Sequence, residues 1–184
     1  ADKRTILNNI NLNIEKGDTI AVIGPSGSGK STLFKQLNNL ISPTEGELYL
    51  DGKNYNDYSP EELRSRVSYL MQQSGLIGST IEHNMKFPCE ARGDKFDREK
   101  AKQLIKQVGL GDYDLDAEIE HMSGGERQRI TIARQLMYEP EVLLLDESIS
   151  ALDTKNKENI ENIIFDLAKK GVAILWITHS DDQS

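Results

Sequence analysis

Short runs of apolar residues alternate along this chain with stretches in which apolar residues recur every three or four positions. The runs predict strands, and the periodic stretches predict helices with one buried face. Strands are expected at residues 19–23, 67–70, 142–145 and 172–177. Helices are expected at about residues 33–41, 104–108, 123–137 and 160–168. This alternation predicts an α/β fold with a mainly parallel sheet, in which the strand at 19–23 is buried.

Two regions depart from the alternation. Residues 6–14 alternate apolar and polar side chains, and residues 47–50 lead into an Asp51-Gly52 turn. The first pattern predicts a half-buried strand and the second a strand that closes in a turn, and we expect the two to form an antiparallel β layer. Residues 74–121 are largely polar and loop-rich, which predicts a small helical insertion. The 184 residues should thus form one domain, with the core and β layer over about 1–73 and 126–184 and the insertion over about 74–125.

Composition and charge narrow the classes of function. The net charge is −8 with no long basic run, so no nucleic-acid partner is expected. The arginines at 127, 129 and 134 are interpreted as surface ion pairs. The longest apolar runs reach about six residues, whereas a membrane-spanning helix needs about 20. The single cysteine, Cys89, cannot form an internal disulfide, which suits a reducing cytosol.

The strongest chemical signal lies between the first predicted strand and helix. There the chain fits the phosphate-binding pattern G-x-x-x-x-G-K-[ST] at every fixed position. A glycine-rich turn lets backbone N–H groups converge on an anion, and the helix N-terminus adds about half a positive charge. Lys30 can reach the terminal phosphates, and the Ser31 hydroxyl can bind Mg²⁺. The expected nucleoside-triphosphate-binding residues of this P-loop NTPase core are Gly24, Pro25, Ser26, Gly27, Ser28, Gly29, Lys30, Ser31 and Thr32.

An acidic pair, Asp146 and Glu147, follows the predicted strand at 142–145. Ligands of parallel sheets bind beyond the carboxyl ends of the strands. Asp146 is therefore expected to hold Mg²⁺, and Glu147 to accept a proton from an attacking water. Taken alone, such a pair more often marks a solvated loop, and it is the phosphate loop that favours the catalytic interpretation.

A second candidate anion site begins at Ser123. The run Ser123-Gly124-Gly125-Glu126 opens a predicted helix, so it offers a capping hydroxyl and unobstructed backbone N–H groups. A protein with a single phosphate loop would not need this second anion-binding helix N-terminus. By itself, this run would be interpreted as a helix N-cap followed by permissive glycines.

In their order, these motifs resemble those of the ATP-binding cassette (ABC) ATPases, and the resemblance covers nearly the whole chain. Its further elements are Gln72 after the strand at 67–70, Asp153 in Ser150-Ala151-Leu152-Asp153, and His179 in Ile177-Thr178-His179. The commonest residues in the family are replaced by Met122 and Glu126 at the signature, and by Ser148 after the glutamate. The two replacements at the signature are tolerated variations.

The resemblance implies roles that the spacing alone does not. Gln72 would sense Mg²⁺ and the attacking water, and His179 would touch the γ-phosphate. Ser123, Gly124, Gly125 and Glu126 would contact ATP held by a second copy of the chain. Asp153 would lie at that dimer contact, so that two copies sandwich two nucleotides with their Mg²⁺.

Within the family, the sequence favours the motor subunit of a bacterial membrane transporter, on the cytoplasmic face of the membrane. A soluble machine of DNA repair or translation is disfavoured, because the gap between phosphate loop and signature is short and the chain has one cassette. A degenerate regulatory cassette is disfavoured because Lys30, Glu147 and His179 are present. The coupling helix of a membrane subunit is expected near Leu76, Ile77, Ile81, Met85 and Phe87. The alternative for about half of these residues is that they pack inside the helical insertion.

The transported substrate is expected from a closer resemblance. Residues 6–11, 79–88 and 174–179 are similar to those of bacterial iron-export ATPases. This favours export of iron or another metal ion, and the alternative is an importer ATPase for phosphate or another small solute. The family places an adenine-stacking aromatic residue upstream of Ala1 and continues beyond Ser184, so we expect a piece of a longer protein, truncated at both ends.

Overall fold

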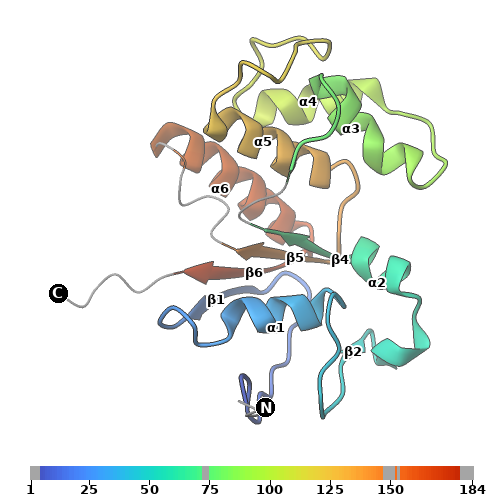
Figure 1. Ribbon diagram of the computed structural model, residues 1–184, viewed down its shortest axis with the longest axis vertical. Coiled ribbons are helices and arrows are strands. Elements are labelled where there is room, and N and C mark those ends of the chain that lie inside the picture. Colours follow the sequence, from blue (N-terminus) through green and yellow to red (C-terminus); the bar gives the residue numbers. More distant parts are fainter. Residues whose placement is uncertain (1–4, 72–74, 147–151, 153, 179–184) are drawn as a thin grey trace.

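A sheet of four parallel strands forms the centre of the molecule. The computed structural model describes residues 5–71, 75–146, 152 and 154–178. The strands are β1 (Thr19–Ile23), β4 (Val67–Leu70), β5 (Val142–Asp146) and β6 (Ala173–Thr178), in the spatial order β1-β6-β5-β4. All three neighbouring pairs run parallel (Figure 1). The α/β fold with a parallel sheet is therefore confirmed, and the carboxyl ends of all four strands lie along one edge.

Helices cover both faces of the sheet (Figure 1). On one face, α1 (Lys30–Leu37) buries Phe34 completely among residues of β4, β5 and β6. Burying one such aromatic side chain contributes about 1.5–3 kcal/mol. The opposite face carries α5 (Gly124–Gln135) and α6 (Thr154–Lys169), with α3 (Ile81–Glu90) and α4 (Arg98–Gln107) packed on their outer side. Each face of the sheet has its own hydrophobic core. Adjacent residues of β5 pack alternately into one core and the other, because successive side chains of a strand point to opposite faces.

The predicted strand at 19–23 is in the right place, but its predicted burial is wrong. All four residues of β4 and the central three of β5 are buried. In β1, exposed and half-buried residues alternate, and Ile23 is 63% exposed. The half-buried residues Ile20 and Val22 pack against the core that contains Phe34, whereas Ile23 and the other residues on the opposite face of β1 are exposed.

The predicted strand at 6–14 is absent. Residues 5–14 form no strand, and Ile6 and Ile10 are exposed. Asn9 takes a positive φ of 51°, which interrupts an extended backbone. Of the expected antiparallel layer, the described residues contain one short hairpin, β2 (Tyr49–Leu50) with β3 (Lys53–Asn54), closed by the predicted Asp51-Gly52 turn.

Helix boundaries differ from the sequence prediction at several places. The first helix ends at Leu37, so Leu40 and Ile41 lie beyond it and are exposed. The short helices η1 (Tyr55–Asp57) and α2 (Pro60–Arg66) were not predicted, although Ser59 and Pro60 form a recognisable helix start. Helix α3 was also missed, because a proline at position 88 masked its four-residue apolar spacing. No helix in the described ranges is long and apolar enough to cross a membrane.

Candidate nucleotide-binding site

The phosphate loop joins the carboxyl end of β1 to the start of α1. Gly27 and Gly29 take φ values of 77° and 92°, a left-handed backbone that glycine adopts without strain. A Cβ atom on Gly29 would also lie 2.9 Å from Cδ2 of Leu7 and 3.2 Å from the carbonyl oxygen of Ile6. Gly29 occupies the N-cap position of α1 and makes no side-chain hydrogen bond, so it does not itself cover the first N–H groups of the helix. This backbone arrangement is suited to a phosphate group.

The ammonium group of Lys30 folds back over this loop. Its Nζ donates hydrogen bonds to the carbonyl oxygens of Gly24 at 2.6 Å and Pro25 at 2.8 Å, and to Oγ of Ser28 at 3.4 Å. All three acceptors are neutral, so these bonds do not compensate the positive charge. A bound phosphate would therefore be attracted to Lys30 by a full unit of charge as well as by the backbone N–H groups.

Ser31 and Asp146 meet at the carboxyl edge of the sheet. The Ser31 hydroxyl donates a hydrogen bond of 2.9 Å to Oδ2 of Asp146, although 115 positions separate the two residues. Asp146 is the last residue of β5, and Ser31 lies in the first turn of α1, which starts from the same sheet edge. The parallel sheet thus brings together two of the three residues that the sequence predicted around Mg²⁺; the third, Gln72, lies outside the described residues.

The donor set of this pair fits Mg²⁺. A hydroxyl and a carboxylate are hard oxygen ligands, and Mg²⁺ in nucleotide sites is held by one or two such groups together with phosphate oxygens. Among the described residues, no three His, Cys, Asp or Glu side chains gather as a metal site. Ser31 and Asp146 are the residues that would hold the ion, whose charge would neutralise the phosphates when bound.

Tyr69 is a third member of this cluster that the sequence analysis missed. Its hydroxyl donates a hydrogen bond of 2.6 Å to the same Oδ2 atom of Asp146. Burial, and then the hydrogen bond to Asp146, raise the pKa of Tyr69 well above its usual range, so the phenol keeps its proton. No local pattern in the sequence marks Tyr69, because its partner lies 77 positions away and only the pairing of β4 with β5 brings the two residues together.

The signature run forms the N-terminus of α5 as predicted. Oγ of Ser123 accepts a hydrogen bond from the backbone N–H of Glu126 at 3.2 Å, and Oε2 of Glu126 accepts one from the N–H of Ser123 at 2.8 Å. These bonds form a capping box. The Tyr113 hydroxyl donates a third bond of 2.9 Å to Glu126. The backbone bond from Ser123, followed by the bond from Tyr113, lowers the pKa of Glu126.

The two candidate anion sites lie on opposite sides of the sheet. Helix α1 covers one face and α5 the other (Figure 1). The N-termini of α1 and α5 in one chain are therefore not arranged around a single phosphate group.

Four predicted site residues, Gln72, Glu147, Asp153 and His179, lie outside the described residues. Their assignments remain predictions from the sequence.

Within the part of the chain that the structure describes, the arginines of α5 do not form the predicted surface ion pairs. Arg129 is buried and donates to the carbonyl oxygens of Val108 and Gly109 at 3.0 Å and to Oδ1 of Asn156 at 2.8 Å. Arg127 and Arg134 likewise donate to backbone carbonyl oxygens. The prediction was wrong for Arg129 and Arg134 because α3 and α4 pack against α5, so that these two side chains face other segments, whereas Arg127 is exposed.

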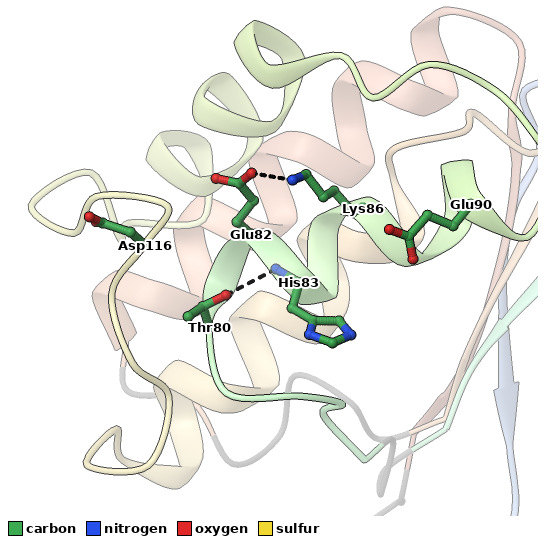
Figure 2. A pocket seen from close by; sticks show the side chains of 6 residues that line it. All are labelled: Thr80, Glu82, His83, Lys86, Glu90 and Asp116. Atoms are coloured by element: carbon green, nitrogen blue, oxygen red, sulfur yellow. Dashed lines mark hydrogen bonds and ion pairs between the residues drawn. The ribbon is translucent and has the colours of Figure 1, made fainter.

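A separate pocket lies beside α3, away from the phosphate loop. It is lined by Thr80, Glu82, His83, Lys86, Glu90 and Asp116 (Figure 2). Glu82 and Lys86 form an ion pair of 2.5 Å across one turn of the helix. Figure 2 shows Asp116, His83 and Glu90 pointing in different directions, so they form no converging set of ligands. This pocket contains none of the predicted nucleotide-binding residues.

Residues 7–150 match the family model described as ABC transporter. The chain belongs to the ABC transporter ATP-binding family. A relative from Escherichia coli K12 named "Probable iron export ATP-binding protein FetA" is 41% identical over 179 residues, covering 97% of this chain and 80% of the relative. The methionine import ATP-binding protein MetN of Staphylococcus haemolyticus is 42% identical over 180 residues, covering 94% of this chain and 52% of the relative.

Solved structures of the family have the same fold. A bacterial Atm1-family ABC exporter with ATP bound superposes with a TM-score of 0.86 at 29% identity, over 97% of this chain and 32% of that chain. The dimeric bacterial ABC transporter cassette MJ0796 gives 0.83 at 33% identity, over 95% of this chain and 80% of that chain. The ABC ATPase fold and the family predicted from the motifs are thus confirmed, whereas the relatives transport different substrates.

Proposed function

We propose that this chain is the ATP-hydrolysing subunit of an ABC transporter and acts on the cytoplasmic face of a bacterial membrane. The observation that carries the proposal is the contact between Ser31 and Asp146, with its oxygen distance of 2.9 Å. It joins a P-loop hydroxyl to a carboxylate at the sheet edge, beside a lysine whose ammonium group is bonded to neutral oxygens. Family membership supports the same function.

The residues of the proposed site have complementary parts. The backbone N–H groups of the loop from Gly24 to Ser31 and the Lys30 ammonium bind the phosphates. Ser31 and Asp146 hold Mg²⁺, which neutralises charge on the phosphates when it is bound. Glu147, one residue beyond Asp146, accepts the proton of the attacking water, while Gln72 and His179 contact the reacting groups.

We propose further that two copies of the chain form the complete site. In each copy, Ser123 and Gly125 would face the γ-phosphate bound by the partner, because α1 and α5 lie on opposite faces of the sheet. The dimeric state of the MJ0796 cassette, including a structure with ADP and inorganic phosphate at 34% identity, supports this arrangement. Asp153 would lie at the contact between the two copies.

A separate integral membrane subunit would complete the transporter. The relative named as an iron export ATP-binding protein covers 97% of the chain and supports export of iron or another metal ion. Import of a small solute is the alternative, which the methionine import relative supports.

ATP turnover by the purified chain tests the proposal. Phosphate release should require Mg²⁺, and Lys30→Ala should abolish it by weakening ATP binding. Glu147→Gln should keep ATP binding and lose about 10²–10⁴-fold in turnover. Lys35→Ala is the matched control, because Lys35 is an exposed lysine on the same helix, α1. Turnover of the Glu147→Gln variant at the rate of the unmodified chain would contradict the assignment of the base.

A further inference from the structure

One oxygen atom, Oδ2 of Asp146, accepts hydrogen bonds from two hydroxyl groups that belong to different elements. Ser31 donates from α1 at 2.9 Å, and Tyr69 donates from β4 at 2.6 Å. The phosphate-loop pattern and the acidic pair account for Ser31 and Asp146. They leave the tyrosine without a role, although its bond to the carboxylate is the shorter of the two.

The tyrosine side chain is held rigidly. Its backbone pairs with Leu144 of β5, two positions before the aspartate. The ring is 6% exposed and makes an edge-to-face contact with Phe34 of α1, with ring centres 5.8 Å apart and an interplanar angle of 86°. Aromatic pairs in this geometry add stabilisation beyond that of the area they bury. The hydroxyl is thus fixed in place from two sides, by the sheet and by the helix that follows the phosphate loop.

We propose that Tyr69 is a positioning residue for the magnesium–nucleotide site, where its hydroxyl holds the carboxylate of Asp146 in the orientation that receives the ion. The inference rests on the proposed nucleotide-binding function and adds a residue outside its motifs. Its chemistry is that of an outer hydrogen-bond donor, which fixes the rotation of a ligating carboxylate without binding the metal itself.

The two donors to Asp146 differ in what they can do when the ion binds. The Ser31 hydroxyl is itself a candidate ligand, so its oxygen would turn toward the metal. Tyr69 is on the neighbouring strand and is no such ligand, so its bond to Oδ2 can persist. A carboxylate held at one oxygen has already lost its rotational freedom, and less entropy is lost when the ion binds.

The substitution Tyr69→Phe removes the donor and keeps the ring, including its contact with Phe34. ADP binding to the full chain would be measured by calorimetry, first in EDTA and then across a Mg²⁺ titration. We expect the Mg²⁺ concentration at half-effect to rise about tenfold, because loss of an outer-shell partner typically weakens metal binding by 10–100-fold. ADP affinity in EDTA should stay within about twofold, since the phosphate loop is unchanged.

Tyr55→Phe is the matched control. Tyr55 is also a buried tyrosine, and its hydroxyl donates a hydrogen bond of 2.7 Å to the carbonyl oxygen of Leu37, away from Asp146. Loss of the Tyr55 hydroxyl should lower thermal stability about as much as Tyr69→Phe does, and it should leave the Mg²⁺ titration unchanged. A shift in both variants would mean that general loosening of the core, and not the bond to Asp146, sets metal affinity.

The outcomes separate this inference from the proposed function. If the unmodified chain binds ADP with no influence of Mg²⁺, the proposed function fails and the inference fails with it. If Mg²⁺ strengthens binding to the unmodified chain and Tyr69→Phe behaves identically, the inference alone is overturned. A lower Mg²⁺ concentration at half-effect in Tyr69→Phe than in the unmodified chain would also overturn the inference, because the hydroxyl would then be competing with the ion.

Discussion

Arg134 on α5 donates a hydrogen bond from Nη1 to Oδ1 of Asn84 on α3, over 3.2 Å. The amide of Asn84 is fully buried and bonds the backbone of Ile77 twice, at 2.9 Å to its N–H and at 2.8 Å to its carbonyl oxygen. Arg134 also donates to the carbonyl oxygen of Gly75 at 3.2 Å. The pair therefore fixes the backbone of residues 75–77 to the helix that begins with the signature run.

Replacing Asn84 with alanine should destabilise the fold strongly. The change would leave the N–H and carbonyl groups of Ile77 without their partner and would remove an acceptor from Arg134. Each buried polar group left unsatisfied costs about 1–3 kcal/mol, so we expect the free energy of unfolding to fall by about 2–4 kcal/mol. Urea unfolding measures this change.

Asn162→Ala is the control, because Asn162 is an exposed asparagine on α6. It should change the free energy of unfolding by no more than about 0.5 kcal/mol. Equal losses in the two variants would show that the buried amide network contributes nothing specific.

The phosphate loop and β5 could be placed from the sequence because their signals are local. The glycines at 27 and 29 adopt the left-handed backbone that their residue type permits, and the apolar run before Asp146 has the composition of a strand buried on both faces. A single short window of sequence determines each of them. The meeting of Ser31 with Asp146 followed from the rule that parallel strands present their carboxyl ends at one edge.

Other features depend on contacts between distant segments. Tyr69 and Asn84 are ordinary residues in their own windows, and their roles arise from partners brought close by the fold. The alternation at 6–14 failed as a strand signal because strands need a partner, which no local pattern supplies. Arg129 and Arg134 were misjudged for a similar reason, since the sequence does not reveal that α3 and α4 pack against α5.

Stability in acid should depend in part on Glu126. Its hydrogen bond from the Ser123 N–H, and then that from Tyr113, lower the pKa of this carboxyl in the folded state. The stabilisation is therefore present above the unfolded pKa of about 4.3, and it is lost as the pH falls through the lower folded value. Glu126→Gln keeps a capping acceptor and cannot titrate, so its free energy of unfolding should fall less steeply below about pH 4.5.

The difference should be less than about 1 kcal/mol, because the group is partly exposed to solvent. Urea unfolding at neutral and acid pH measures it. Tyr113→Phe removes the second hydrogen bond to Glu126. It should also make the free energy of unfolding fall less steeply in acid, but by a smaller amount than Glu126→Gln does. If the free energy of unfolding falls equally in acid for Glu126→Gln and for the unmodified chain, the capping carboxylate does not couple pH to folding.

Contact with a membrane subunit should involve Phe87 and not the whole set expected from the sequence. Ile81 and Met85 are fully buried in the core and cannot reach a partner, whereas Phe87 is 48% exposed. In a background with Cys89 replaced by alanine, a cysteine at position 87 should crosslink to the membrane subunit of the reconstituted transporter. A cysteine at Asn56, which is exposed on η1, should not. The opposite result would place the docking surface on the side of the β hairpin.

Dimer formation through the signature run should be sensitive to a carboxylate at Gly125. A Cβ atom there would meet Cδ2 of Leu152 at 3.8 Å, an ordinary contact, so a side chain is sterically tolerated and the variant should fold. Gly125→Asp would place a negative charge at the N-terminus of α5, where the partner's γ-phosphate is proposed to bind, and repulsion should prevent the dimer. ATP binding to each monomer should remain, because the phosphate loop lies on the other face of the sheet.

The measurement is light scattering with and without ATP, in a Glu147→Gln background that blocks turnover. Gly125→Ala separates charge from size: it adds a methyl group at the same place and should dimerise far better than Gly125→Asp. If ATP produces as much dimer in Gly125→Asp as in the parent, the signature run does not face a nucleotide in the partner. If the alanine variant also loses the dimer, while both variants keep ATP binding, close approach of the backbone rather than charge is what the second glycine provides.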